Sequence, residues 1–190
     1  MKKHCWKWLY WLGFLIMGAG FTADIWWLIA VGIIVVMVSA ANISTRYYKK
    51  LFRVTVDYTK TLVEMIKAGN YDWVDSDITD KNFPLQGQGQ VELNIKLINY
   101  GKFMDSAEII RDLDNRGLRP ATLPELLAFG SKYPEKQREF PIVALGSLWR
   151  YWHGPRSVEC LRGSGSKRIL VLGTWGGGWN GYYHFAALRK

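Results

Sequence analysis

Few residues of this chain have the types and the spacing that enzyme chemistry requires. Three histidines, His4, His153 and His184, and two cysteines, Cys5 and Cys160, are spread over 190 residues. The cysteines are too far apart to indicate a disulfide framework, and with the histidines they form no metal-binding motif. The sequence has no Ser–His–Asp set, no paired carboxylates and no HExxH motif. We therefore predict a protein that is not an enzyme and that carries no metal or cofactor.

Two other patterns resemble ligand-binding loops but lack their defining residues. The acids Asp72, Asp75, Asp77 and Asp80 are closely spaced, yet they lack the glycine and the bidentate glutamate that an EF-hand loop needs at fixed positions. The glycine run at 176–178 lacks the GK[ST] ending and the following helix of a phosphate-binding loop. We interpret the acids as solvated loop residues.

The chain is basic, with 25 Lys and Arg against 16 Asp and Glu and a net charge of +9. Because it has no basic helix, no zinc-ligand spacing and no recognition motif, nucleic acid is not an expected partner. Much of the excess charge instead flanks an apolar stretch, where positive residues set the orientation of a membrane span. These flanking residues are Lys2, Lys3, Lys7, Arg46, Lys49, Lys50 and Arg53.

The apolar stretch predicts a membrane anchor over residues 1–43. Leu9–Gly20 and Ile25–Ala41 are almost entirely apolar, and Asp24 is the only acid between or within them. A bilayer-spanning helix needs about 20 apolar residues. Basic residues on both flanks favour a helical hairpin with Asp24 at its tip and both ends on the cytoplasmic side. Two alternatives stay open: a signal peptide followed by an anchor, and a single anchor helix with an exported soluble domain.

A basic stalk is expected over 44–53 and one soluble domain over 54–190, which is long enough for a single hydrophobic core. Alternating apolar residues predict strands at Leu51–Tyr58 and Val91–Leu97. Capping-box spacings and glycine stops predict helices at Thr61–Ala68, from Asp105 to Gly117 and from Thr122 onward. Between the last two helices, Gly117–Thr122 is expected to form a sharp corner.

The C-terminal third has a different texture, rich in glycine and tryptophan. A buried strand is predicted at Pro141–Leu145, followed by short strand fragments at Trp149, Ile169–Leu172 and Phe185–Leu188. Because strands and helices are segregated along the chain, we predict a mixed α+β domain.

Five motifs in this region resemble, in their order, those of a known family. They are Gly117–Leu127 (GLRPATLPELL), Leu145–Trp149 (LGSLW), Arg168–Leu172 (RILVL), Trp179 and His184–Lys190 (HFAALRK). The chain from Val54 to Lys190 is thus similar to the variable proteins of diversity-generating retroelements. Their C-terminal domain has a C-type lectin fold, which formylglycine-generating, sulfatase-modifying enzymes share. In that fold a GGSW strand and a terminal GFRLAR-like strand bracket an irregular stretch, and Gly146–Trp149 and His184–Arg189 occupy those places.

The resemblance implies a variable-type region over about 145–190. In the family, a reverse transcriptase rewrites adenine-derived codons there, while scaffold positions stay fixed. The implied ligand-binding residues are Arg150, Tyr151, Trp152, His153, Ser157, Glu159, Arg162, Thr174, Trp175, Asn180, Tyr182 and Tyr183. Further varied positions are implied at Pro155, Gly173, Gly176, Gly177 and Gly181. Tyrosine, tryptophan, glycine, serine and asparagine are the residues that binding loops favour.

Residue chemistry predicts that some residues of this third are scaffold. Trp149 and Trp179 are expected to be core aromatics, because tryptophan is mostly buried on average. Arg119 and Arg168 are expected to pair with a carboxylate or with carbonyl groups. Cys160 is expected to be a buried thiol that behaves as a small hydrophobe.

The sequence therefore predicts a recognition protein anchored in a prokaryotic cytoplasmic membrane, with a diversifiable C-terminal surface. Its partners are the bilayer and an unidentified protein or other macromolecule. One alternative is a membrane protein whose lectin-like domain makes fixed protein–protein contacts. A degenerate sulfatase-modifying enzyme is a third reading, but that chemistry needs a reactive cysteine pair and Cys160 stands alone.

Overall fold

Strands dominate the part of the chain that the computed structural model describes, residues 51–150 and 153–190. These residues belong to the compact unit Lys50–Lys190. The elements are β1 (Phe52–Asp57), α3 (Leu62–Gly69), β2 (Trp73–Val74), β3 (Gln90–Asn99), α4 (Ser106–Asn115), β4 (Leu118–Pro120), α5 (Leu123–Lys132), α6 (Lys136–Glu139), β5 (Ile142–Arg150), β6 (Arg156–Ser164), β7 (Lys167–Thr174), the 3-10 turn η1 (Trp175–Gly177) and β8 (His184–Arg189). The predicted mixed α+β class is confirmed.

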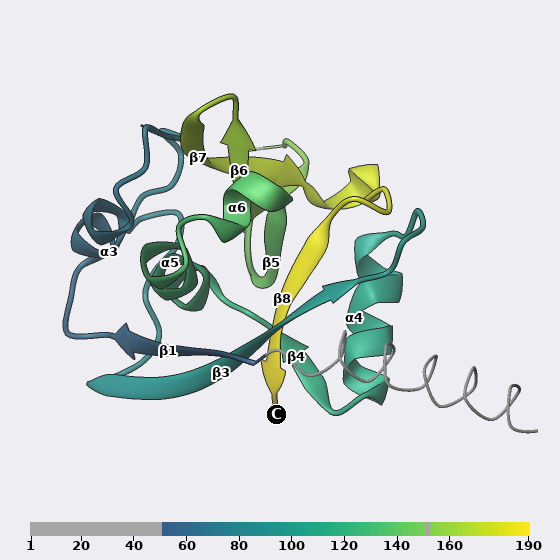
Figure 1. Cartoon of the computed structure of the whole chain (residues 1–190), viewed down its shortest axis with the longest axis horizontal. Helices are drawn as coiled ribbons and strands as arrows, with labels where there is room; N and C mark the ends of the chain where they lie inside the picture. Colours follow the sequence, from purple (N-terminus) through teal and green to yellow (C-terminus); the bar gives the residue numbers. More distant parts are fainter. Residues whose placement is uncertain (1–50, 151–152) are drawn as a thin grey trace, which may run out of the picture. The chain divides into compact units, whose positions relative to one another are not determined.

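The strands form one sheet in the order β1-β3-β8-β5-β6-β7-β2, with β4 pairing β8 beside this path. The terminal strand β8 runs through the middle of the domain (Figure 1). On one edge it pairs antiparallel with β3, and on the other it pairs parallel with β5 and antiparallel with β4. The motif strand β5 and the terminal motif strand β8 are therefore neighbours.

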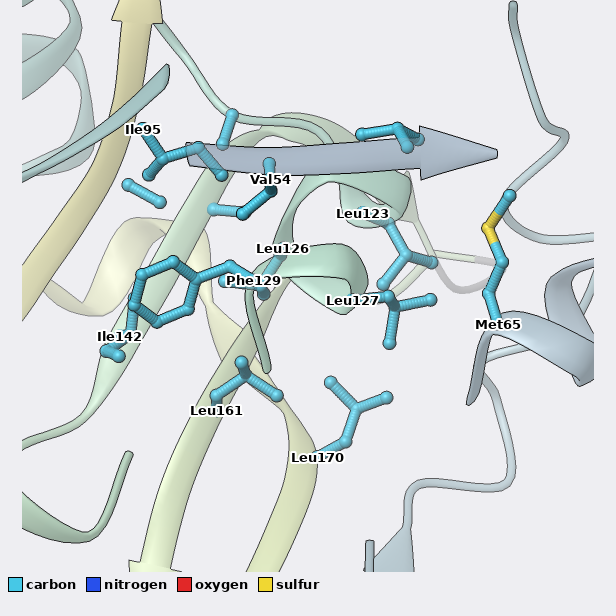
Figure 2. Close-up of a cluster of buried hydrophobic side chains, with 14 of the residues drawn as sticks. Val54, Met65, Ile95, Leu123, Leu126, Leu127, Phe129, Ile142, Leu161 and Leu170 are labelled. Atoms are coloured by element: carbon cyan, nitrogen blue, oxygen red, sulfur yellow. The ribbon is translucent and has the colours of Figure 1, made fainter. Parts of the chain in front are cut away.

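The central strands β5, β6 and β8 are buried on both faces, and their successive residues point alternately into two hydrophobic clusters. One hydrophobic cluster joins α3 and α5 to the sheet and includes Ile142, Leu161 and Leu170; Figure 2 shows these side chains around Phe129 of α5. The second cluster joins α4 to the other face and includes Val143 and Cys160. The domain is thus a sheet between two helical layers.

The three predicted helices, α3, α4 and α5, begin where the sequence predicts. The Asp105 side chain accepts a hydrogen bond from the Glu108 backbone N–H at 2.7 Å, and Glu108 reaches back to Asp105. The same reciprocal capping opens α3 at Thr61. At α5, the Glu125 carboxylate accepts from the Thr122 backbone N–H at 2.8 Å. Each arrangement satisfies donors that a helix start leaves unpaired.

The structure explains why the LGSLW motif has a glycine at position 146. β5 pairs with β6 in two stretches, and the register shifts between Ala144 and Trp149. Within this bulge the Gly146 backbone N–H donates to the Ala121 carbonyl at 2.8 Å. A Cβ at Gly146 would lie 2.5 Å from the same oxygen. Only glycine therefore allows this approach without a shift of the backbone.

Several boundaries differ from the sequence predictions. Phe52 and Arg53, assigned to the stalk, lie in β1, because the Phe52 ring is buried against Phe129 at a centroid distance of 5.2 Å. The corner at 117–122 contains the short strand β4. The stretch expected to be irregular between the two motif strands contains the antiparallel pair β6 and β7.

The predicted anchor, residues 1–43, and most of the predicted stalk lie outside the described residues. Among the helices that the structure does describe, none has both the length and the apolar character needed to cross a bilayer.

Candidate binding groove

A groove of about 350 Å³ lies where α6, the end of β6 and the loop before β8 meet. Four of the predicted ligand-binding residues line it: Arg162, Asn180, Tyr182 and Tyr183. The other lining residues are Gln137, Arg138, Phe140, Pro141, Gly163 and Gly165. The fold thus brings together residues from three separate segments of the sequence, 137–141, 162–165 and 180–183.

The loop 180–183 is held in one conformation by its own hydrogen bonds and by Asn99 at the end of β3. The Asn99 side-chain amide donates to the carbonyls of Gly181 and Tyr183 at 2.8 and 2.9 Å. Within the loop, the Asn180 side-chain oxygen accepts from the Tyr182 N–H at 2.9 Å. This wall of the groove is therefore formed before any ligand arrives.

The two tyrosines of the loop occupy different environments. Tyr182 is 59% exposed, and its hydroxyl donates to the Glu139 carbonyl at 2.8 Å, which ties the loop to the end of α6. Tyr183 packs edge-on against Trp179 at a centroid distance of 5.0 Å. Trp179 is itself buried, and its indole N–H donates to the Ser106 hydroxyl at 2.8 Å. The prediction that Trp179 is a core aromatic is confirmed.

Two arginines give the groove its charge. Arg138 forms an ion pair with Glu135 at 3.2 Å and donates to the Ser166 carbonyl, so its position is fixed. Arg162 is exposed near the end of β6. Among the hydrogen bonds and ion pairs of the described residues, none involves the Arg162 guanidinium. An unpaired guanidinium in a hollow is available to a ligand.

α6 is fastened to the sheet by the buried side chain of Gln137. Its amide donates to the backbone carbonyls of Arg162 and Ile169, at 3.0 and 3.3 Å. Its side-chain oxygen accepts from the buried Arg168 guanidinium at 3.0 Å. Because both polar atoms of the Gln137 side chain are hydrogen-bonded, α6 is held against β6 and forms the second wall of the groove.

His184 lies beside the groove, and its ring packs against an aromatic neighbour. Its ring stacks on Phe140 with the centroids 3.6 Å apart. Burial lowers the pKa of His184, so the imidazole is neutral at pH 7. The stacked pair lies next to Tyr182, whose carbonyl oxygen is 3.3 Å from His184 Nδ1.

The remaining predicted residues that the structure describes do not line this groove. Arg150, His153, Ser157, Thr174 and Trp175 lie at the other end of the β5–β6–β7 sheet, where Ser157 pairs with Thr174 and Arg156 stacks over the Trp175 ring at 5.7 Å. Arg162 lies five residues after Ser157 in β6, a distance of about 16 Å along the strand. The predicted surface is therefore two separate regions. Tyr151 and Trp152 lie outside the described residues.

Glu159 was predicted to contact ligand, and this placement is wrong. Its exposed fraction is 0%, and neither carboxylate oxygen has a hydrogen-bond partner in the described part of the chain. Glu159 lies in β6 opposite Leu172 and Ala144. Residues 159 and 161 share a face of the strand, so Glu159 points towards the same buried layer as Leu161. Burial raises the pKa of its carboxyl well above the ordinary value.

Two positions implied to vary are also fixed by packing. A Cβ at Gly181 would lie 2.5 Å from the Gly101 backbone carbon, and one at Gly173 would lie 2.8 Å from the Trp179 ring. At Gly176 no atom lies within 4 Å of the added carbon. Gly181 and Gly173 thus belong to the frame, whereas Gly176 can change.

Cys160 and the acids Asp72 and Asp75 are placed by packing and by backbone hydrogen bonds. Cys160 is buried as predicted, and burial raises the pKa of its thiol to about 12, which makes it a poor nucleophile. In residues 51–150 and 153–190 no group of three acids, histidines or cysteines could hold a metal ion. In the acidic loop, Asp72 accepts from the Arg168 backbone N–H at 2.6 Å and Asp75 from that of Asp77 at 3.1 Å, so these carboxylates cap the backbone.

Sequence reasoning missed one wall of the groove. Arg138 and Gln137 lie in a single helical turn that shows no apolar periodicity, and nothing in the sequence indicates that this turn packs on β6. Comparison of the chain with protein-family profiles, with curated proteins and with solved structures found no match. Function is therefore inferred from the groove and from the sequence.

Proposed function

We propose that the domain is a recognition module that binds a macromolecular ligand in the groove between α6, the end of β6 and the loop 180–183. One observation carries the proposal: Arg162, Asn180, Tyr182 and Tyr183 converge on a single hollow whose walls are fixed by Asn99 and Gln137. A preformed site loses little conformational entropy on binding. Tyrosine and arginine are also the residues that most often dominate binding energy at interfaces.

Two features support a place for this module in the variable-protein family with a C-type lectin fold. The motif residues Gly146–Trp149 and His184–Arg189 lie on β5 and β8, which are adjacent in the sheet. The open positions near η1 can accept new side chains without disturbing the core. In this proposal residues 1–43 anchor the module in a prokaryotic cytoplasmic membrane, as the basic flanks of the apolar segments indicate.

The alternative of a fixed contact surface has its own support. Glu159, Gly173 and Gly181, all implied to vary, are constrained by burial or by close backbone contacts. A neighbouring reverse-transcriptase gene, with a template repeat that differs from codons 174–177 mainly at adenines, would favour a varied surface. Absence of the repeat, or differences concentrated at codons 159, 173 and 181, would favour a fixed one.

Recognition itself is tested by selection of random peptides on the full-length protein in lipid nanodiscs. We expect peptides that bind the unmodified protein but not Tyr182→Ala, because that change removes the exposed ring and its bond to α6. Arg111→Ala, an exposed residue of α4 outside the groove, is the matched control. Recovery of no peptide, or of peptides that bind Tyr182→Ala equally well, would contradict the proposal.

A further inference from the structure

The C-terminal segment that supplies most of the groove's lining residues has more basic than acidic residues. From Arg150 to the last residue the sequence has a single acid, Glu159, and that side chain is buried. Of its exposed bases, Arg162 and Lys167 lie at the groove end of β6 and β7. Arg150 and Arg156 lie at the other end of the β5–β6–β7 sheet. Arg189 and Lys190 end β8, and Lys190 pairs with Asp114. A hollow with one sign of charge concentrates ligands of the opposite sign.

The residues that line the groove also include more basic than acidic side chains. No acid is among its lining residues. Glu135 and Glu139, which are close in sequence to the lining residues Gln137 and Arg138, pair with Arg138 and Lys136. Of the two arginines that line the groove, Arg162 is the one without an ion-pair partner among the described residues. A guanidinium can bind a carboxylate through two parallel hydrogen bonds.

The side-chain donors of the groove that have no hydrogen-bond partner among the described residues are the Arg162 guanidinium and the Asn180 amide NH₂. The Asn180 side-chain oxygen is occupied by the Tyr182 N–H, so the amide NH₂ is the part left for a ligand. The hydroxyl of Tyr182 is already engaged as a donor to Glu139. A ligand that presents acceptors therefore fits this site better than one that presents donors.

Size and lining distinguish a peptide from a small anion. About 350 Å³ falls within the range of sites that enclose organic ligands, about 300–1,000 Å³. The Phe140 and Tyr182 rings supply apolar surface beside Arg162. Nucleic acid needs a row of phosphate contacts, whereas this groove offers one unpaired guanidinium among aromatic rings.

We infer that the groove binds an acidic peptide segment, with a carboxylate held by Arg162 and Asn180 and a neighbouring apolar side chain packed against Tyr182 and Phe140. This inference rests on the proposed function and names the chemistry of its ligand. The probe is a capped tetrapeptide of alternating glutamate and phenylalanine, and its matched analogue has glutamine in place of glutamate.

Binding of both peptides to the full-length protein in nanodiscs is measured by fluorescence anisotropy. We expect the glutamate peptide to bind about tenfold more tightly than the glutamine peptide, since a hydrogen bond to a charged group is the larger contribution. Arg162→Gln should abolish this preference, Arg162→Lys should retain part of it, and the control Arg111→Gln should leave it unchanged. Binding of neither peptide, or an equal loss with Arg111→Gln, would overturn the inference.

The arms of the experiment separate this inference from the proposed function. If both peptides bind equally and Tyr182→Ala removes both, recognition stands and the acidic ligand is wrong. Stronger displacement by inorganic phosphate or by an oligonucleotide than by the glutamate peptide would assign the groove to a phosphate-bearing ligand and overturn the inference.

Discussion

The Arg168 guanidinium donates to the carbonyl oxygen of Gly130 at 2.7 Å, which joins β7 to the last turn of α5. Its other terminal nitrogen donates to the Gly69 carbonyl at 2.7 Å, at the end of α3. A helix leaves its last carbonyls unpaired, and a cation there also interacts favourably with the helix dipole. One buried side chain therefore completes two helix ends and, through Gln137, positions a wall of the groove.

Arg168→Met tests this role. The change keeps an unbranched side chain but leaves the carbonyls of Gly69 and Gly130 and the Gln137 oxygen unpaired in the interior. We expect a loss of about 3–5 kcal/mol in the free energy of unfolding. Urea denaturation measures it, with Arg111→Met on the exposed face of α4 as the control, expected within about 0.5 kcal/mol. A similar small loss for both variants would show that Arg168 does not join the helices.

Glu159 predicts an unusual pH dependence of stability. Its carboxyl titrates near pH 4.3 in an unfolded chain, whereas burial raises its pKa in the folded protein. Between these two pKa values the Glu159 carboxyl is protonated in the folded protein and ionised in the unfolded chain. The protonated carboxyl therefore stabilises the fold fully at low pH. This stabilisation is lost as the pH rises through the folded pKa, by up to about 1.4 kcal/mol for each pH unit between the two values.

Glu159→Gln keeps the shape of the side chain and removes the ionisation. We expect this variant to be more stable than the unmodified protein at pH 8, with the difference shrinking towards pH 4.5. Urea midpoints at several pH values measure the effect, and Glu135→Gln, at an exposed acid, is the control. A difference that does not change with pH would mean that the Glu159 carboxyl has a partner in the folded protein.

The sequence predicted α3, α4 and α5 well because their starts carry local chemistry. Asp105 with Glu108 and Thr61 with Glu64 make capping contacts within four residues, so no distant part of the chain is needed to recognise them. β3 was predicted from alternation, which reflects one exposed face. These signals act over a single turn or a single strand.

β6 was missed because its middle is buried on both faces. Val158, Cys160 and Leu161 face two different cores, so the strand shows no apolar–polar alternation, and the buried Glu159 interrupts what would otherwise be an apolar run. The groove was predicted only in part for a related reason. The resemblance indicated Arg162 and the residues of the loop 180–183. The packing of α6 against β6 depends on hydrogen bonds from Gln137 to residues far away in the sequence, which no local pattern indicates.

Gly181 and Gly176 give a direct comparison of frame and variable positions. Gly181→Ala would force a methyl group against the Gly101 backbone, so we expect a loss of about 1–3 kcal/mol. Gly176→Ala projects into open space and should change stability by about 0.5 kcal/mol or less. Thermal unfolding of the two variants measures this. Equal destabilisation would mean that the η1 region is part of the frame and is not free to vary.

Asn99 controls how rigid the groove is, and its effect can be separated from ligand contact because Asn99 does not line the groove. Asn99→Ala removes two hydrogen bonds to the loop carbonyls, so we expect faster amide hydrogen exchange over residues 180–183 and a loss of about 1–2 kcal/mol in stability. The control is Asn94→Ala, at an exposed asparagine of the same strand. Since preorganisation lowers the cost of binding, the glutamate peptide should also bind more weakly to Asn99→Ala. Unchanged hydrogen exchange in the loop would show that the Tyr182 hydrogen bond to α6 is enough to hold the loop 180–183 in place.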